Sequence, residues 1–182
     1  MTARPVRTIC LHGAESTGKT VLAGRLAAHF GTELVPEYGR IWAETHGTEF
    51  AMADLVAIAR THDAMTRAAL ARSGAPVILD TDPLMTAVWA DMLFGQRDPW
   101  FDAWHGTADL YLLLDTDLPW VEDGTRLFGT AEARAKFQSL SQAELERRGV
   151  PWTRVGGQGE ARFENALAAI RAWAPPHLFG RH

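Results

Sequence analysis

The stretch Gly13-Ala14-Glu15-Ser16-Thr17-Gly18-Lys19-Thr20 decides the fold of this chain. It fits the pattern G-x-x-x-x-G-K-[ST], in which glycines let backbone N–H groups turn inward around a phosphate. The residue frequencies of the chain give roughly one accidental match per several hundred such sequences. The motif also follows an apolar run and opens an amphipathic stretch. It therefore predicts a phosphate-binding loop, a P-loop, for ATP and Mg²⁺.

The chemistry of a nucleoside triphosphate gives each part of this loop an expected role. The backbone of residues 13–18 is expected to surround the β-phosphate, because the helix that starts near Lys19 points its positive end at the same anion. Lys19 is expected to reach the β- and γ-phosphates, and the Thr20 hydroxyl is expected to ligate Mg²⁺.

Apolar runs alternate with amphipathic stretches on both sides of the loop. The expected strands are residues 8–11, 33–35, 77–79, 109–114 and 152–155. The expected helices are residues 20–30, 51–72, 84–94, 131–148 and 161–174. Continuous apolar strands separated by helices predict a five-stranded parallel sheet covered on both faces. The length suits a single domain over residues 1–182, with a lid-like loop around residues 116–130.

Composition and charge narrow the classes of partner. The net charge is −4 with 22% charged residues, which does not predict a nucleic-acid-binding surface. No apolar run approaches the ~18 residues of a membrane span, so no membrane partner is expected. The single cysteine, Cys10, lies in an expected strand and is read as a core residue. One thiol cannot form an internal disulfide, which favours a cytoplasmic protein.

Acidic residues follow the expected strands, at the edge where ligands bind in open α/β sheets. Asp80 closes the run Val77-Ile78-Leu79 and is a candidate for the magnesium shell. Glu37 and Asp82 are candidates for the substrate hydroxyls and for the general base, with a helix cap or turn as the alternative for each. Asp115 and Asp117 are interpreted as turn residues.

Two further residues are singled out by their positions. Arg126 lies in the glycine-containing loop after the fourth strand, where an arginine could close over the phosphates and stabilise the transferring charge. A solvated loop charge is the alternative. His62 lies on the apolar stripe of the helix expected over residues 51–72, which favours a core or pocket-wall histidine over a catalytic one.

Four segments carry a resemblance to a known family. They are Gly13 to Thr20, Glu37-Tyr38-Gly39-Arg40, Asp80-Thr81-Asp82, and Trp120-Val121-Glu122-Asp123-Gly124-Thr125-Arg126. In this order and at similar spacing they resemble the ribosylnicotinamide kinase domain of the NadR-type proteins of NAD biosynthesis. The resemblance runs from the first strand to Arg162-Phe163. It implies an adenylate-kinase-like P-loop kinase fold and a kinase standing alone, without the DNA-binding and adenylyltransferase regions of full-length relatives.

The resemblance implies ATP-dependent phosphorylation of the 5′-hydroxyl of nicotinamide riboside, giving nicotinamide mononucleotide. A cationic pyridinium riboside suits acidic residues together with aromatic walls. The family places tryptophan where this chain has Pro36, so another aromatic residue would stack on the ring, from Tyr38, Trp42, Trp89 and Trp120. The expected substrate-binding residues are Glu37, Tyr38, Arg40, Trp42, Asp82, Trp120 and Asp123.

Two other functions stay open at this point. The first is another small-molecule P-loop kinase, such as one for deoxynucleosides, which also carries Glu near the end of the second strand. The second is an ATP-dependent regulatory switch without a small acceptor. A guanine-specific switch is disfavoured, because the only asparagine, Asn165, is not part of an Asn-Lys-x-Asp motif. The sequence leaves the oligomeric state open.

Overall fold

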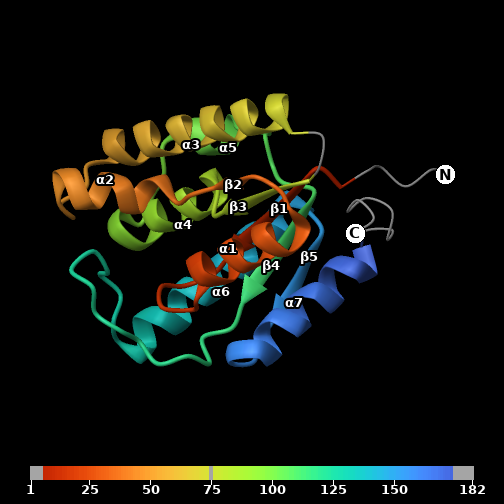
Figure 1. Cartoon of the computed structure of the whole chain (residues 1–182). Helices are drawn as coiled ribbons and strands as arrows, with labels where there is room; N and C mark the ends of the chain where they lie inside the picture. The colour runs from red at the N-terminus through yellow and green to blue at the C-terminus, as the bar shows by residue number, and fades with distance from the viewer. Residues whose placement is uncertain (1–5, 74–75, 174–182) are drawn as a thin grey trace.

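The computed structural model describes residues 6–73 and 76–173. Five parallel strands form one sheet in the order β2-β3-β1-β4-β5 (Figure 1). They are β1 (Thr8–His12), β2 (Leu34–Val35), β3 (Val77–Asp80), β4 (Leu110–Leu114) and β5 (Trp152–Val155). The predicted three-layer α/β/α fold is thereby confirmed.

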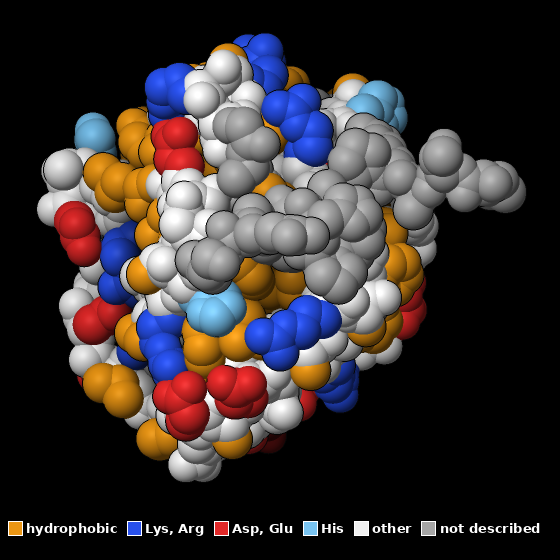
Figure 2. Space-filling view, turned by 45° about the vertical axis from the view of Figure 1, so that its right-hand side comes forward, with side chains coloured by type: hydrophobic (Ala, Val, Ile, Leu, Met, Phe, Trp, Pro, Cys, Tyr) orange, Lys and Arg blue, Asp and Glu red, His pale blue; other side chains and the backbone are white. Residues whose placement is uncertain are grey.

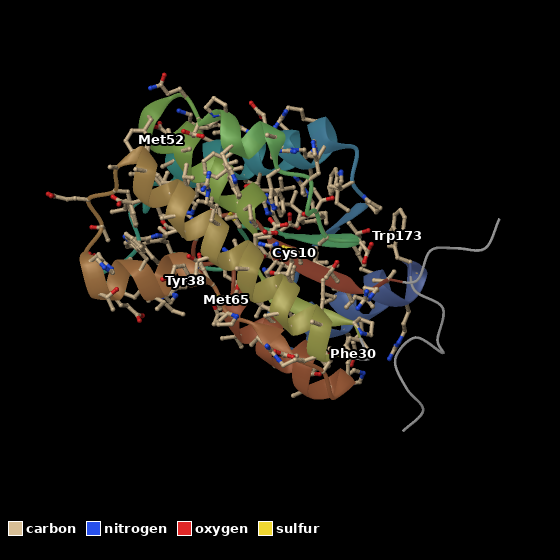
Figure 3. All side chains as sticks on the ribbon, turned by 90° about the horizontal axis from the view of Figure 1, so that it is seen from above. Cys10, Phe30, Tyr38, Met52, Met65 and Trp173 are labelled. Carbon is tan, nitrogen blue, oxygen red and sulfur yellow. The ribbon has the colours of Figure 1, made fainter. Side chains whose placement is uncertain are left out.

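The alternation of side chains along β1 explains the two helical layers. Ile9 and Leu11 lie on one face, where they pack with α1 (Lys19–Phe30) and α7 (Gly159–Trp173). Cys10 lies on the other face and packs in one cluster with residues of α3, α4 and α6. These helices are α3 (Met52–Arg72), α4 (Pro83–Phe94) and α6 (Ala131–Arg148). Figure 3 shows Cys10 in the middle of the molecule, which agrees with the core position expected for it.

Two helices were not expected from the sequence. The first, α2 (Tyr38–His46), has nine residues and buries only Ala43. The second, α5 (Pro99–Ala103), is a single short turn. Its start is marked by Asp98, whose side chain accepts a hydrogen bond from the Trp100 N–H at 2.8 Å, and by a proline in the first helical position. The helix expected over residues 161–174 ends at Trp173, and residue 174 lies outside the described part.

The site follows from the direction of the strands. Because the strands are parallel, their carboxyl ends meet at one edge of the sheet, and the P-loop, Glu37 and Asp82 all come just after a strand end. The connection from β4 to α6 leaves the sheet and extends toward the side where α2 lies (Figure 1).

The surface seen in Figure 2 and the helices add two observations. On the face seen in Figure 2, basic and acidic side chains are interspersed rather than gathered by sign. Within residues 6–73 and 76–173, no helix has an apolar stretch long enough to pass through a bilayer.

Candidate active site

The loop between β1 and α1 has the backbone shape that its glycines allow. Gly13 has a φ of +125° and Gly18 a φ of +78°, values that glycine adopts without strain. A Cβ atom on Gly13 would lie 2.9 Å from the carbonyl oxygen of Leu114 on β4. A larger residue would therefore push the loop away from the sheet. With this loop in place, the free N–H groups at the start of α1 form an anion site.

Lys19 is held against the same loop. Its Nζ atom donates hydrogen bonds to the carbonyl oxygens of Gly13 at 3.0 Å and Ala14 at 2.7 Å. Burial lowers the pKa of Lys19, while the negative charges of Glu37 and Asp80 act in the opposite direction. The P-loop carbonyls thus hold the ammonium group beside the site where the phosphates are expected to bind.

A cavity of about 310 Å³ opens beside the P-loop, which is within the range of small-molecule sites. One part of its lining is polar and charged, from the P-loop, Glu37, Arg40, Thr125 and Arg126. The other part comes mainly from α3, α4 and α6 and is largely apolar. Its members are Phe50, Leu55, Ile58, His62, Met85, Thr86, Trp89 and Phe137. The arrangement suits a ligand with a polar phosphate end and a flat apolar end.

Glu37 lines the cavity, as does Glu15 of the P-loop. It precedes the first turn of α2, and its side chain is 21% exposed. Burial, followed by the nearby charge of Asp80, raises the pKa of Glu37 to about 7. A carboxylate with such a pKa is suited to accept a proton near neutral pH.

Asp82 lies apart from the cavity lining. One carboxylate oxygen accepts a hydrogen bond from the Leu84 N–H at 2.9 Å, which caps α4. The other accepts a hydrogen bond from the hydroxyl of Tyr111 on β4. Burial raises the pKa of Asp82 to about 6. The structure therefore shows Asp82 as a helix cap, which was the alternative role for this residue. The role of Asp82 toward substrate stays a prediction.

The segment after β4 is bound directly to the P-loop. The Arg126 Nη1 atom donates to the hydroxyl of Ser16 at 2.7 Å. The Glu15 carboxylate accepts hydrogen bonds from the backbone N–H of Leu127 at 3.1 Å and of Phe128 at 2.8 Å. Two variable positions of the loop motif therefore hold the segment in place. From the sequence alone, Glu15 was expected only to be one member of the phosphate-binding loop.

Asp123 joins that segment to α2. It accepts a hydrogen bond from Arg40 at 2.8 Å and forms an ion pair with Arg126 at 3.0 Å. Partial burial of Asp123 acts against ionisation, but the hydrogen bonds from Arg40 and Thr125 and the charge of Arg126 lower its pKa to about 2. Asp123 itself does not line the cavity, whereas both of its arginine partners do.

Of the four aromatic residues expected near the substrate ring, Trp89 lines the cavity, whereas Tyr38, Trp42 and Trp120 do not. Trp89 lies on the cavity lining, with its ring centroid 5.0 Å from that of Phe128 and 5.9 Å from that of Phe137. Tyr38 packs in the α3–α4 cluster, and Trp42 stacks on His46 at 4.3 Å. The ring of Trp120 lies where a Cβ on Gly129 would meet it at 2.9 Å. Substrate roles for Tyr38, Trp42 and Trp120 stay predictions.

Thr20 and Asp80 fit the magnesium role expected for them. Burial raises the pKa of Asp80, and the nearby Thr20 hydroxyl acts in the opposite direction. Asp80 is 1% exposed, and its Oδ1 atom has no hydrogen-bond partner among the described residues. A buried carboxylate oxygen beside a hydroxyl suits a cation that prefers oxygen ligands. No cluster of three His, Cys, Asp or Glu residues in the described ranges could hold a metal, so phosphate and water would complete the shell.

A family model described as an AAA domain matches residues 8–162. The trifunctional NAD biosynthesis/regulator protein NadR of Escherichia coli (strain K12) is 32% identical over 173 residues, which cover 91% of this chain and 42% of the relative. The chain thus spans about two fifths of the length of this relative. The resemblance expected from the motifs is confirmed.

Solved structures give the same fold. A NadR protein crystallised in complex with NR matches with a TM-score of 0.79 at 24% identity, over 95% of this chain and 53% of that one. A thymidylate kinase from Ehrlichia chaffeensis matches with a TM-score of 0.69 at 15% identity, over 93% of this chain and 99% of that one. At these identities the likeness establishes a P-loop kinase fold.

Proposed function

Since the chain belongs to the AAA domain family of P-loop proteins, we propose that it is an ATP-dependent kinase of nicotinamide riboside. It transfers the γ-phosphoryl group of ATP to the 5′-hydroxyl and gives nicotinamide mononucleotide in NAD salvage. The observation that carries the proposal is the single cavity that the P-loop shares with Glu37 and with an apolar, aromatic wall. The similarity to a NadR protein named for NAD biosynthesis supports the choice of acceptor.

Different residues of the chain have different roles in the phosphoryl transfer. A bond forms between the riboside 5′-oxygen and the γ-phosphorus, and the bond to the β-phosphate bridge oxygen breaks, releasing ADP. Glu37 accepts the hydroxyl proton, since it lines the cavity whereas both oxygens of Asp82 are engaged. Lys19 and Arg126 stabilise the charge on the phosphoryl oxygens. Mg²⁺, held by Thr20 and Asp80, would neutralise phosphate charge when bound.

The charges on the lining favour a cationic acceptor. Glu15 and Glu37 line the cavity together with Lys19, Arg40 and Arg126. With Arg40 paired to Asp123 and with Lys19 and Arg126 engaged by the phosphates of ATP, the two carboxylates are left to attract the pyridinium ring of nicotinamide riboside. The carboxylate of nicotinic acid riboside adds a negative charge that the same residues repel. We therefore expect a preference for the amide form. We place the reaction in the cytoplasm, because it consumes ATP and the single thiol needs no oxidising compartment.

The test is a panel of acceptors offered to the purified full chain with ATP and Mg²⁺. The panel holds nicotinamide riboside, nicotinic acid riboside, deoxyadenosine and thymidine, and products are read by mass spectrometry. We expect nicotinamide mononucleotide and ADP in equal amounts. Preferred phosphorylation of a deoxynucleoside would replace the proposal with a deoxynucleoside kinase. ATP hydrolysis that is indifferent to every acceptor would favour a regulatory switch.

A further inference from the structure

His62 lies on the cavity wall and has no part in the chemistry described so far. It belongs to α3, where it shares one helical stripe with the lining residues Leu55 and Ile58. In Figure 3, α3 can be followed from Met52 at its start past Met65, and His62 lies between these two residues in the chain. The structure therefore places an ionisable side chain in the otherwise apolar stripe that faces the ligand.

The imidazole of His62 is buried without full hydrogen bonding. The residue is 1% exposed, and its Nε2 atom has no hydrogen-bond partner within the part of the chain that the structure describes. Buried polar atoms are nearly always paired, so an unpaired one on a cavity wall points to a partner supplied by a ligand.

The surroundings of His62 indicate which part of the ligand it meets. From α3 the cavity is lined by Leu55, Ile58 and His62, and from α4 by Met85, Thr86 and Trp89. His62 is the titratable group among these six lining residues. A flat ring that is apolar on its faces and carries a single polar substituent matches such a wall.

Resting on the proposed function, we propose that His62 determines specificity for the base of the acceptor, by hydrogen bonding the carboxamide of the nicotinamide ring while Trp89 contributes the apolar wall beside it. The 5′-hydroxyl is then left for Glu37 at the polar part of the lining. This assigns a hydrogen-bonding residue to the ring end of the ligand, for which the sequence motifs supply only aromatic candidates.

The ionisation of His62 suits this role. Burial lowers the pKa of His62 to about 4, with the charge of Asp63 acting in the opposite direction. The ring is therefore neutral at neutral pH, with one nitrogen that donates and one that accepts. A carboxamide also offers a donor and an acceptor. A neutral ring does not repel the pyridinium cation, and it offers no charge to the carboxylate of nicotinic acid riboside.

The proposal is tested with two acceptors that differ only in the carboxamide. These are nicotinamide riboside and N-ribosylpyridinium, which has the same cation and ribose. For His62→Leu we expect kcat/KM with nicotinamide riboside to fall about tenfold, on the scale of one hydrogen bond. With N-ribosylpyridinium we expect less than a twofold change. His62→Gln, which keeps a donor and an acceptor, should recover part of the loss.

Thr66→Val is the matched control. Thr66 lies one turn further along α3, is 8% exposed, and has a hydroxyl without a hydrogen-bond partner in the described ranges. It does not line the cavity. The control should leave the ratio of the two acceptors unchanged. An equal loss on both acceptors in His62→Leu, or no loss on nicotinamide riboside, overturns the role of His62.

A second measurement uses the unaltered protein, so it tests the role of His62 even if the variants do not fold. The ¹⁵N signals of the His62 ring are recorded during titration with each riboside. We expect them to shift with nicotinamide riboside and to stay in place with N-ribosylpyridinium. Turnover of neither riboside by the wild-type chain would refute the proposed kinase function. Signals that do not move with nicotinamide riboside refute the role of His62, whatever the turnover shows.

Discussion

Lys19 is the residue whose removal should stop transfer most directly. Its ammonium group hydrogen-bonds only to the Gly13 and Ala14 carbonyls of its own loop in the described structure, so the hydrogen bonds lost on substitution are confined to that loop. We expect Lys19→Ala to lower kcat by ~10²-fold or more, the usual effect of losing one preorganised charge. Circular dichroism should show an unchanged melting curve. Normal turnover in the folded variant would contradict the P-loop assignment.

Glu37 and Asp82 should respond in opposite ways to substitution. Glu37→Gln removes the proposed base, so we expect kcat to fall by ~10²-fold or more with little change in stability. Asp82→Ala removes the cap of α4 and leaves the Tyr111 O–H without an acceptor, although its oxygen still accepts from the Ala108 N–H, which should cost about 1–3 kcal/mol of unfolding free energy. Steady-state kinetics and urea melts measured on both variants separate the two roles. Wild-type kcat/KM in Glu37→Gln would move the base elsewhere.

The ionisation of Glu37 should depend on Asp80. Burial and then the Asp80 charge raise the pKa of Glu37 to about 7, and removing a neighbouring negative charge favours the ionised form. In Asp80→Asn we therefore expect a lower pKa for Glu37. The ¹³C signal of the Glu37 carboxyl, followed over pH in the free protein, measures it in both chains. Identical titration curves would show that the two acids do not interact.

At the level of elements, the connection from β4 to α6 and the P-loop act together. Arg126 bonds the Ser16 hydroxyl and pairs with Asp123, so it lies beside the expected phosphate site. We expect Arg126→Ala to lower kcat more than it raises the KM for ATP, because its charge is needed most as the phosphoryl group moves. Arg134→Ala is a useful comparison, since Arg134 also contacts this segment but does not line the cavity. A change confined to KM would make Arg126 a binding residue only.

Some of these elements could be predicted from the sequence and others could not. The sheet and the P-loop were predictable, because long apolar runs and a phosphate motif are local signals. The helix α2 was missed, although its nine residues have an amphipathic pattern, because it is short and begins just after Pro36, which follows the preceding strand. The wall of the cavity was harder still. Met85 and Phe137 come from different helices, and only packing brings them to one ligand. For His62, the helical stripe did indicate a place in the core or on the pocket wall.

At the scale of the whole molecule, stability should respond to the protonation of His12. Both ring nitrogens of His12 lie without hydrogen-bond partners among the described residues, and the residue is 0% exposed. Burial and then the charge of Lys19 lower its pKa to about 3. The unfolded chain takes up this proton below about pH 6.5, whereas the folded chain does not until far lower pH. The contribution of neutral His12 to the unfolding free energy is therefore complete above about pH 6.5 and is lost as the pH falls below that value.

The variant His12→Gln isolates this contribution. Between about pH 6 and pH 4.5, the wild-type chain should lose up to ~1.4 kcal/mol per pH unit more unfolding free energy than the variant. Urea unfolding at several pH values measures the difference between the two chains. Parallel curves for the two would mean that His12 is protonated equally in the folded and unfolded states.

The carboxylate of Asp123 interacts with both Arg40 and Arg126. This shared contact affects which substitutions the three positions can accept in evolution. The two arginines come from segments far apart in the chain, yet each is balanced by the same negative charge. A lineage that loses the acid is left with two neighbouring cations on the lining of the cavity beside the P-loop. We therefore expect the three positions to change together among related sequences, because loss of the acid removes the reason to keep both arginines.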